Sequence, residues 1–196
     1  SFNQNLSNWD VSNVTNMNSM FLGANTFNQP LANWDVSNVR DMYSMFAHTG
    51  FNEDISNWDV SSVLSMRGLF YSNSQFNQNI SDWNVSNVTN FINTFYGASS
   101  FNQDLSNWDV SSATSMYAMF YRAYDFNQDI SGWDVSNVIT MYWLFHQATS
   151  FNQNLSNWNV SNATSMTHMF TSANALSNAN KGFIHSTFSP NSNWPY

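Results

Sequence analysis

Apolar and polar residues alternate along the chain in a frame of 25 residues that occurs seven times. Each copy opens with a phenylalanine, which is position 1 of the frame, and the second copy is one residue shorter. The seven opening residues are Phe2, Phe27, Phe51, Phe76, Phe101, Phe126 and Phe151. A unit of this length cannot bury its apolar side chains alone, so neighbouring copies must stack. The pattern therefore predicts tandem repeats over residues 1–175 and a C-terminal capping segment over residues 176–196.

The second half of each copy has the apolar spacing of a helix. In the first copy Val14, Met17, Met20 and Phe21 follow one another at intervals of three or four residues. A serine stands ahead of this run in every copy, as Ser12 does here, and its hydroxyl can accept a hydrogen bond from a first-turn amide. We therefore expect a helix of about ten residues in each copy, stabilised by its neighbours because it is too short to persist alone.

The first half of each copy has the spacing of a strand. Leu6, Trp9 and Val11 reproduce the L-x-x-L-x-L pattern of leucine-rich repeats, with tryptophan at the central place in every copy. Parallel strands stack about 4.8 Å apart, whereas packed helices need roughly 8 to 10 Å, so the stack should curve. The expected fold is an α/β solenoid, a leucine-rich-repeat-like stack of seven strand-plus-helix repeats with parallel inner strands and outer helices.

These motifs together resemble a known family. The string F-N-Q-[DN]-[LI]-S-x-W-[DN]-V-S-[NS]-V-T-x-M-x-x-M-F resembles the repeats of BspA-like leucine-rich-repeat surface proteins, and it runs through residues 1–175. Residues 176–196 also look like the segment that closes such arrays. The resemblance implies a protein that is secreted or anchored at the cell surface and that acts in adhesion or matrix binding.

Composition narrows the possible partners. Twelve carboxylates against four Lys and Arg give a net charge of −8, which disfavours nucleic acid and anionic membranes as partners. No cysteine is present, which excludes disulfides and thiolate metal ligands. No apolar run approaches the length of a membrane helix, so membrane insertion is not expected. The chain opens directly on a repeat without a polar cap, and this suggests a piece of a longer polypeptide.

One polar column recurs without exception. Asparagine fills position 2 of all seven copies, at Asn3, Asn28, Asn52, Asn77, Asn102, Asn127 and Asn152. A column of amides can bond each repeat to the next and satisfy backbone carbonyls in the loops. We expect a structural ladder here, with a polar binding stripe as the alternative.

Aligned carboxylates raise the question of a metal. Asp104 and Asp109, like Asp129 and Asp134 in the next copy, lie five residues apart, and stacking would bring the pairs close. Calcium prefers such clusters of oxygen ligands, which makes these four residues a candidate calcium site. Equivalent places in other copies hold asparagine or proline, which an obligatory metal would tolerate poorly. Solvated or turn-bonded acids are therefore the competing interpretation, and no other cofactor is expected.

Aromatic residues gather at places outside the apolar face of the expected helices. Tyr43, Tyr117 and Tyr142 share one column, and Tyr71, Tyr96 and Tyr121 share another, with Trp143 beside them. Tyrosine on a rigid surface offers contact area at little entropic cost, as binding hot spots do. These seven residues are candidate binding residues. The alternative is that their rings are partly buried and pack along the stack.

Catalysis finds no support in the pattern. The four histidines, at 48, 146, 168 and 185, do not repeat in register, and neither H-E-x-x-H nor G-x-S-x-G occurs. We therefore expect no enzyme, but an extracellular or cell-surface module that binds proteins or glycans through a repeat surface. The rival is a self-assembling structural subunit of an extracellular fibre or coat. A third alternative is ice or mineral binding through the regular Ser, Thr and Asn columns.

Overall fold

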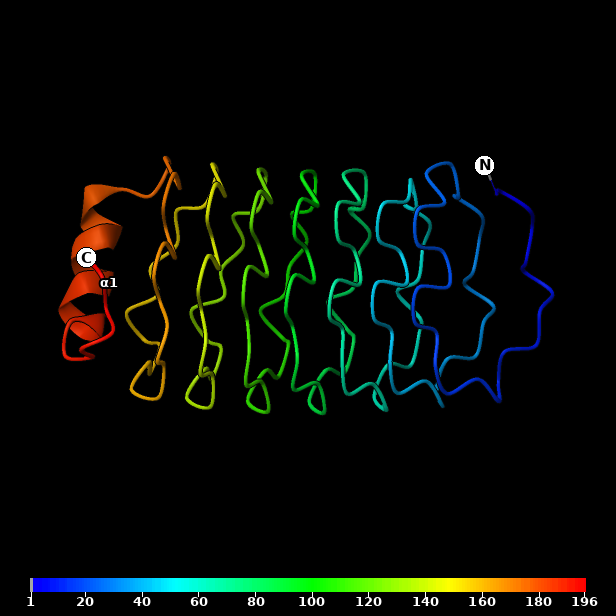
Figure 1. Cartoon of the computed structure of the whole chain (residues 1–196), viewed down its shortest axis with the longest axis horizontal. Coiled ribbons are helices and arrows are strands. Elements are labelled where there is room, and N and C mark those ends of the chain that lie inside the picture. Colours follow the sequence, from blue (N-terminus) through cyan, green and yellow to red (C-terminus); the bar gives the residue numbers. More distant parts are fainter. Residues whose placement is uncertain (1) are drawn as a thin grey trace.

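The seven repeats form seven coils that stack along the long axis of the molecule (Figure 1). The computed structural model describes residues 2–196. Coil 1 spans residues 2–26 and coil 7 spans residues 151–175, and a helix, α1 (Asn178–Phe188), follows coil 7. The helix lies at the opposite end of the stack from coil 1, as the red and blue ends of Figure 1 show.

The coils contain neither of the elements that the sequence predicts. Among residues 2–196, α1 is the single helix, and parallel pairing is limited to isolated bridges at position 15. These bridges join, in chain order, Asn16, Asp41, Ser65, Asn90, Ser115, Thr140 and Ser165. The prediction of an α/β solenoid with seven strand-plus-helix repeats is therefore wrong. Each coil is instead a chain of tight turns.

Left-handed backbone conformations explain why the expected helices do not form. Positions 18 and 22 have positive φ in every coil, as at Ser44 (φ 52°) and His48 (φ 54°) in coil 2. Two such residues four apart end any α-helix between them. The segment turns instead, with the amide of Met45 donating to Met42 O (3.1 Å) and that of Ala47 to Ser44 O (3.2 Å). Successive turns reproduce the three-and-four spacing that is typical of a helix.

Hydrogen bonds between coils alternate with these turns. The amides of Ser19, Phe21 and Gly23 donate to the carbonyls of Tyr43, Met45 and Ala47 in the next coil, at 2.7 to 3.0 Å. The intervening amides donate within their own coil. Backbone groups of this segment are thus satisfied in two directions, which fixes the register of one coil on the next.

The predicted strand also consists of turns. In coil 5 the amide of Trp108 donates to Leu105 O (3.1 Å), and that of Ala113 donates to Val110 O (2.8 Å). The parallel bridges lie in the segment where the helix was predicted. The serine that was predicted as a helix N-cap has another role: the amide and hydroxyl of Ser111 both donate to Asp109 Oδ1, at 3.0 and 2.6 Å. This prediction was wrong because no helix follows the serine.

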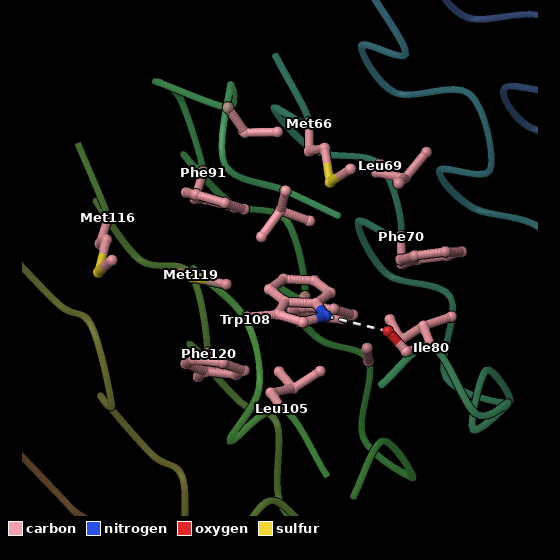
Figure 2. Close-up of a cluster of buried hydrophobic side chains, with 14 of the residues drawn as sticks. Met66, Leu69, Phe70, Ile80, Phe91, Leu105, Trp108, Met116, Met119 and Phe120 are labelled. Carbon is pink, nitrogen blue, oxygen red and sulfur yellow. Dashed lines mark hydrogen bonds between the residues drawn. The ribbon is translucent and has the colours of Figure 1, made fainter. Parts of the chain in front are cut away.

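Columns of aromatic rings fill the interior. Phe95 and Phe120, at position 20 of adjacent coils, stack with their ring centroids 5.5 Å apart, and Phe101 inserts 4.1 Å from Phe95. Trp108 is 3% exposed, and its indole N–H donates to Ile80 O of the preceding coil at 3.0 Å (Figure 2). The same indole bond recurs at each tryptophan of this column from coil 2 to coil 7. The tryptophan column therefore joins apolar packing to a specific polar link.

The asparagine column forms the predicted ladder. The side-chain oxygen of Asn102 accepts a hydrogen bond from the amide of Asn127 in the next coil (2.9 Å) and from the side chain of Gln128 (2.9 Å). The same pattern recurs along the stack. A structural role is confirmed, with the difference that these asparagine oxygens accept amide protons, whereas the prediction had the side chains donate to backbone carbonyls.

The two ends of the stack differ. At the C-terminal end Ser177 accepts from Asn180 N and caps α1, while Ile184 and Phe188 are buried. Asn180 also donates to Asn152 Oδ1 (2.9 Å), in the manner of the glutamines along the ladder. At the other end, Trp9 of coil 1 is 56% exposed although every other tryptophan of its column is buried.

Candidate functional site

The predicted aromatic residues lie together on one side of the stack, at positions 17 to 22 of the coils. The left-handed residues at positions 18 and 22 shape this segment so that positions 16 and 20 are turned into the core. We call the outer surface of this segment the aromatic face. It is formed by His48, Arg67, Arg122 and His168, by His146, and by the predicted Tyr43, Tyr71, Tyr96, Tyr117, Tyr121, Tyr142 and Trp143.

One ridge of the aromatic face is a continuous ring stack. The ring centroids of Tyr71 and Tyr96 lie 4.5 Å apart, those of Tyr96 and Tyr121 4.4 Å, and those of Tyr121 and His146 4.8 Å. The planes of Tyr96 and Tyr121 differ by 4°. Each inner ring is thus covered on both faces by its neighbours, which leaves ring edges for contact with a partner.

Trp143 joins this ridge to the second one. Tyr117 and Tyr142 stack at 5.5 Å, and Trp143 lies 4.6 Å from Tyr142 and 5.6 Å from Tyr121. Its φ of 59° is a rare conformation for so bulky a residue. Most other coils place small side chains at this position, as at Gly68 and Ala118. The same left-handed conformation occurs at position 18 of every coil, so the repeat imposes it on Trp143.

A groove lies on this face over coils 1 to 4, where the residues of position 18 are small. Ser44, Gly68 and Asn93 lie along it, Tyr43 and Tyr71 flank it, and its volume is about 240 Å³. Gly68 has φ 62°, and a Cβ added there would lie 3.0 Å from Ser44 Oγ. Glycine therefore suits both the backbone conformation and the close approach of coil 2.

Basic groups accompany the rings. The guanidinium of Arg67 lies 5.3 Å from the Tyr43 ring centroid, and that of Arg122 lies 5.2 Å from the centroid of Tyr121. Arg122 Nε also donates to Gln147 Oε1 at 2.6 Å. These contacts hold the two cations over aromatic rings at the surface of the protein.

Crowding changes the acid–base behaviour of the face. Burial, with the neighbouring Tyr121 and Tyr71, raises the pKa of Tyr96 to about 12. Burial, with Tyr142 nearby, also raises the pKa of Tyr117. Burial lowers the pKa of His146, and the adjacent His168 lowers it further. These three rings therefore stay uncharged over a wider range of pH than in water.

The structure combines the two interpretations of the aromatic columns. The rings do pack along the stack, yet they remain partly accessible, and Tyr43 is 40% exposed. Sequence reasoning missed His48, Arg67, Arg122, His146 and His168 as members of the same face. For His48, Arg122 and His168 a signal was present: positions 18 and 22 contain no Val, Ile or Thr in any copy, as left-handed conformations require.

The candidate calcium residues are engaged in turns. Asp104 and Asp129 accept from the amides of Ser106 (2.8 Å) and Ser131 (2.9 Å), and these backbone hydrogen bonds lower the pKa of both carboxyls. The pKa of Asp109 and of Asp134 is lowered chiefly by the hydroxyls of Ser111 and Ser136. Within residues 2–196 no three His, Cys, Asp or Glu side chains gather closely enough to hold a metal ion. Calcium stays a hypothesis, which titration calorimetry in millimolar calcium can test.

Over the part of the chain that the structure describes, no helix has both the length and the apolar character needed to cross a membrane.

Similarity to known proteins places the chain in a family. A family match covers residues 1–74 and 103–189, and no match was found among curated proteins or solved structures. The predicted resemblance is confirmed at the level of a repeat family, and the match does not specifically indicate BspA-like proteins. Because the matched segments include most of the chain, the protein belongs to the family described as Mycoplasma protein of unknown function, DUF285.

Proposed function

We propose that this protein is a non-catalytic interaction module, displayed outside the cell or at its surface, that binds a protein or glycan through the aromatic face. The observation that carries the proposal is the convergence of the seven predicted aromatic residues on one face, beside Arg67 and Arg122. Tyr, Trp and Arg are the residue types that dominate binding energy at protein interfaces.

Rigidity supports the proposal. The backbone beneath the face is bonded both within each coil and between coils, so its rings are ordered before a partner arrives. Binding then costs little additional side-chain entropy. The resemblance of the repeat motif to BspA-like surface proteins supports an adhesive role at the cell surface. Both the location and the role are proposals.

A binding screen tests this function. The wild-type protein is applied to arrays of extracellular matrix proteins and glycans, beside a Tyr71→Ser/Tyr121→Ser variant. Tyr124→Ser is the matched control, because Tyr124 is 41% exposed and lies at position 24, outside the aromatic face. We expect a ligand that the double variant loses and the control retains. A ligand that binds all three proteins equally would contradict the assignment of the face.

Self-association is a second candidate function, and coil 1 supports it. In coil 1, Phe2, Trp9 and Leu22 are 44%, 56% and 51% exposed. An apolar coil surface of this kind suits contact between protein molecules. Light scattering over a range of concentrations tests the idea. A mass that rises with concentration and falls back in a Trp9→Ser variant would support assembly, whereas a constant monomer mass would contradict it.

A further inference from the structure

Charge is segregated on this molecule. All twelve carboxylates lie outside positions 17 to 22, which contain two of the four Lys and Arg residues and three of the four histidines. The aromatic face is therefore a strip free of carboxylates that contains two arginines, on a protein whose net charge is −8. Such a strip selects an anionic ligand by charge complementarity, while the surrounding acids repel ligands that extend beyond it.

We propose that the aromatic face binds an extended peptide segment that carries acidic side chains, seated in the groove over coils 1 to 4 and continuing along the face to Arg122 of coil 5. This inference rests on the proposed function and names the chemistry of the partner. The groove has Ser44, Gly68 and Asn93 along it, with Arg67 and His48 among its lining residues. Small side chains along the groove leave room for a peptide backbone, and Arg67 beside them is placed for one of its carboxylates.

The cations are spaced for such a peptide. Arg67 belongs to coil 3 and Arg122 to coil 5, so stacking alone separates them by roughly 10 Å at the spacing of paired parallel chains, and they also lie five positions apart along the coil, at positions 17 and 22. Acidic residues three apart on an extended peptide are separated by about 10 Å and those further apart by correspondingly more, so one peptide can place a carboxylate at each arginine. Asp41 shares a neighbouring hollow with Arg67, but its Oδ1 accepts from the amide of Tyr43 and its Oδ2 from the side chain of Asn18. Arg67 therefore remains open to a ligand carboxylate.

Ring stacking argues against glycans and nucleic acids as the main ligand. Both use exposed aromatic faces, sugars through their apolar faces and bases through stacking. The faces of Tyr96 and Tyr121 are occupied by their neighbours at 4.4 to 4.8 Å. A peptide needs only hydrogen-bonding ring edges and the guanidinium groups. Trp143 stands at position 18 of coil 6, where coils 2 to 5 have smaller side chains, and it lies beside Tyr121 and Tyr142.

Peptide titration tests the inference. The probe is a fluorescein-labelled 12-residue peptide with Glu at every third position and Gly, Ser or Ala between, and its counterpart has Gln in place of Glu. We expect anisotropy to show binding of the acidic peptide and at least roughly tenfold weaker binding of the neutral one, because hydrogen bonds to charged groups contribute this much. An Arg67→Gln/Arg122→Gln variant should lose a similar factor. Arg40→Gln is the matched control, since Arg40 lies at position 14, outside the aromatic face.

The outcomes separate this inference from the proposed function. Equal affinities for the acidic and neutral peptides, no binding of either, or an equal loss in Arg40→Gln would overturn the acidic-peptide assignment. A neutral or sulfated glycan that binds in their place, and that Tyr71→Ser/Tyr121→Ser abolishes, would overturn it too but leave the proposed function standing. If neither the peptides nor any arrayed protein or glycan binds, both proposals fail.

Discussion

Two kinds of aromatic column run along this molecule, and they differ in burial and in regularity. The tryptophans of position 8 are the same in all seven coils and are buried in coils 2 to 7, each bonded to the coil before it. Positions 17 and 21 on the aromatic face change from Tyr to Arg, Ile, His or Thr along the stack. The comparison indicates that packing in the core constrains the residue type in the regular column. Packing constrains the residue type less in the variable columns, where residues can differ from coil to coil and take part in recognition.

The largest effect is expected in the regular column. Trp108→Ala removes a buried ring and leaves Ile80 O without its indole donor, so it should cost about 3 to 5 kcal/mol of unfolding free energy. Trp9→Ala is the control, because the ring of Trp9 is exposed. Urea unfolding measures both. Equal losses of unfolding free energy in the two variants would show that the tryptophan of coil 1 contributes as much to stability as the buried tryptophan of coil 5.

The asparagine ladder should rank next. Asn102→Ala leaves the amide of Asn127 and the side chain of Gln128 without their acceptor, at a cost of about 1 to 3 kcal/mol. Asn107→Ala, at an exposed place in the same coil, should change the urea midpoint little. If both variants unfold at the wild-type midpoint, the ladder does not stabilise the stack.

A smaller and pH-dependent effect is expected at the turn of Ser111. Ser111→Ala removes one hydroxyl donor from the exposed Asp109, so it should cost at most about 1 kcal/mol. Because this bond lowers the pKa of Asp109 in the folded state, its contribution is present above the ordinary carboxyl pKa and is lost as pH falls through the lowered value. The difference between the unfolding free energies at pH 7 and pH 2 should therefore be smaller in Ser111→Ala than in the parent protein. An unchanged difference would show that the hydroxyl does not act on the carboxyl.

The free energy of unfolding at alkaline pH should depend on the tyrosines of the aromatic face. The pKa of Tyr96 is raised to about 12, so stability is unaffected below the ordinary phenol pKa and decreases as pH rises between about 10 and 12. Tyr96→Phe retains the ring and removes the ionisable hydroxyl, and it should lessen this decrease. Thermal unfolding at pH 9 and pH 11 measures the effect. An equal decrease in melting temperature between these pH values in the variant and the parent would contradict the burial of Tyr96 in the ring stack.

The sequence revealed the repeat, its register and its ladder because these depend on residue identities that recur in every copy, such as Asn102 and Trp108. The secondary structure was mispredicted because Met42, Met45 and Phe46 have the same spacing on consecutive turns as on a helix. Only the left-handed positions distinguish the two, and there Gly68 is the plainest signal. The seven aromatic site residues could be named, but the joining of their columns by Trp143 depends on contacts between coils.

The indole N–H signals of the protein test the central claim most directly. Nine tryptophans give nine side-chain signals in a ¹⁵N correlation spectrum, and Trp143 alone among them belongs to the aromatic face. On titration with the acidic peptide, or with the ligand that the arrays identify, we predict that the Trp143 signal moves while those of Trp9 and Trp108 stay in place. Movement of the Trp9 signal with Trp143 unchanged would place the binding surface at coil 1 and contradict the assignment of the aromatic face.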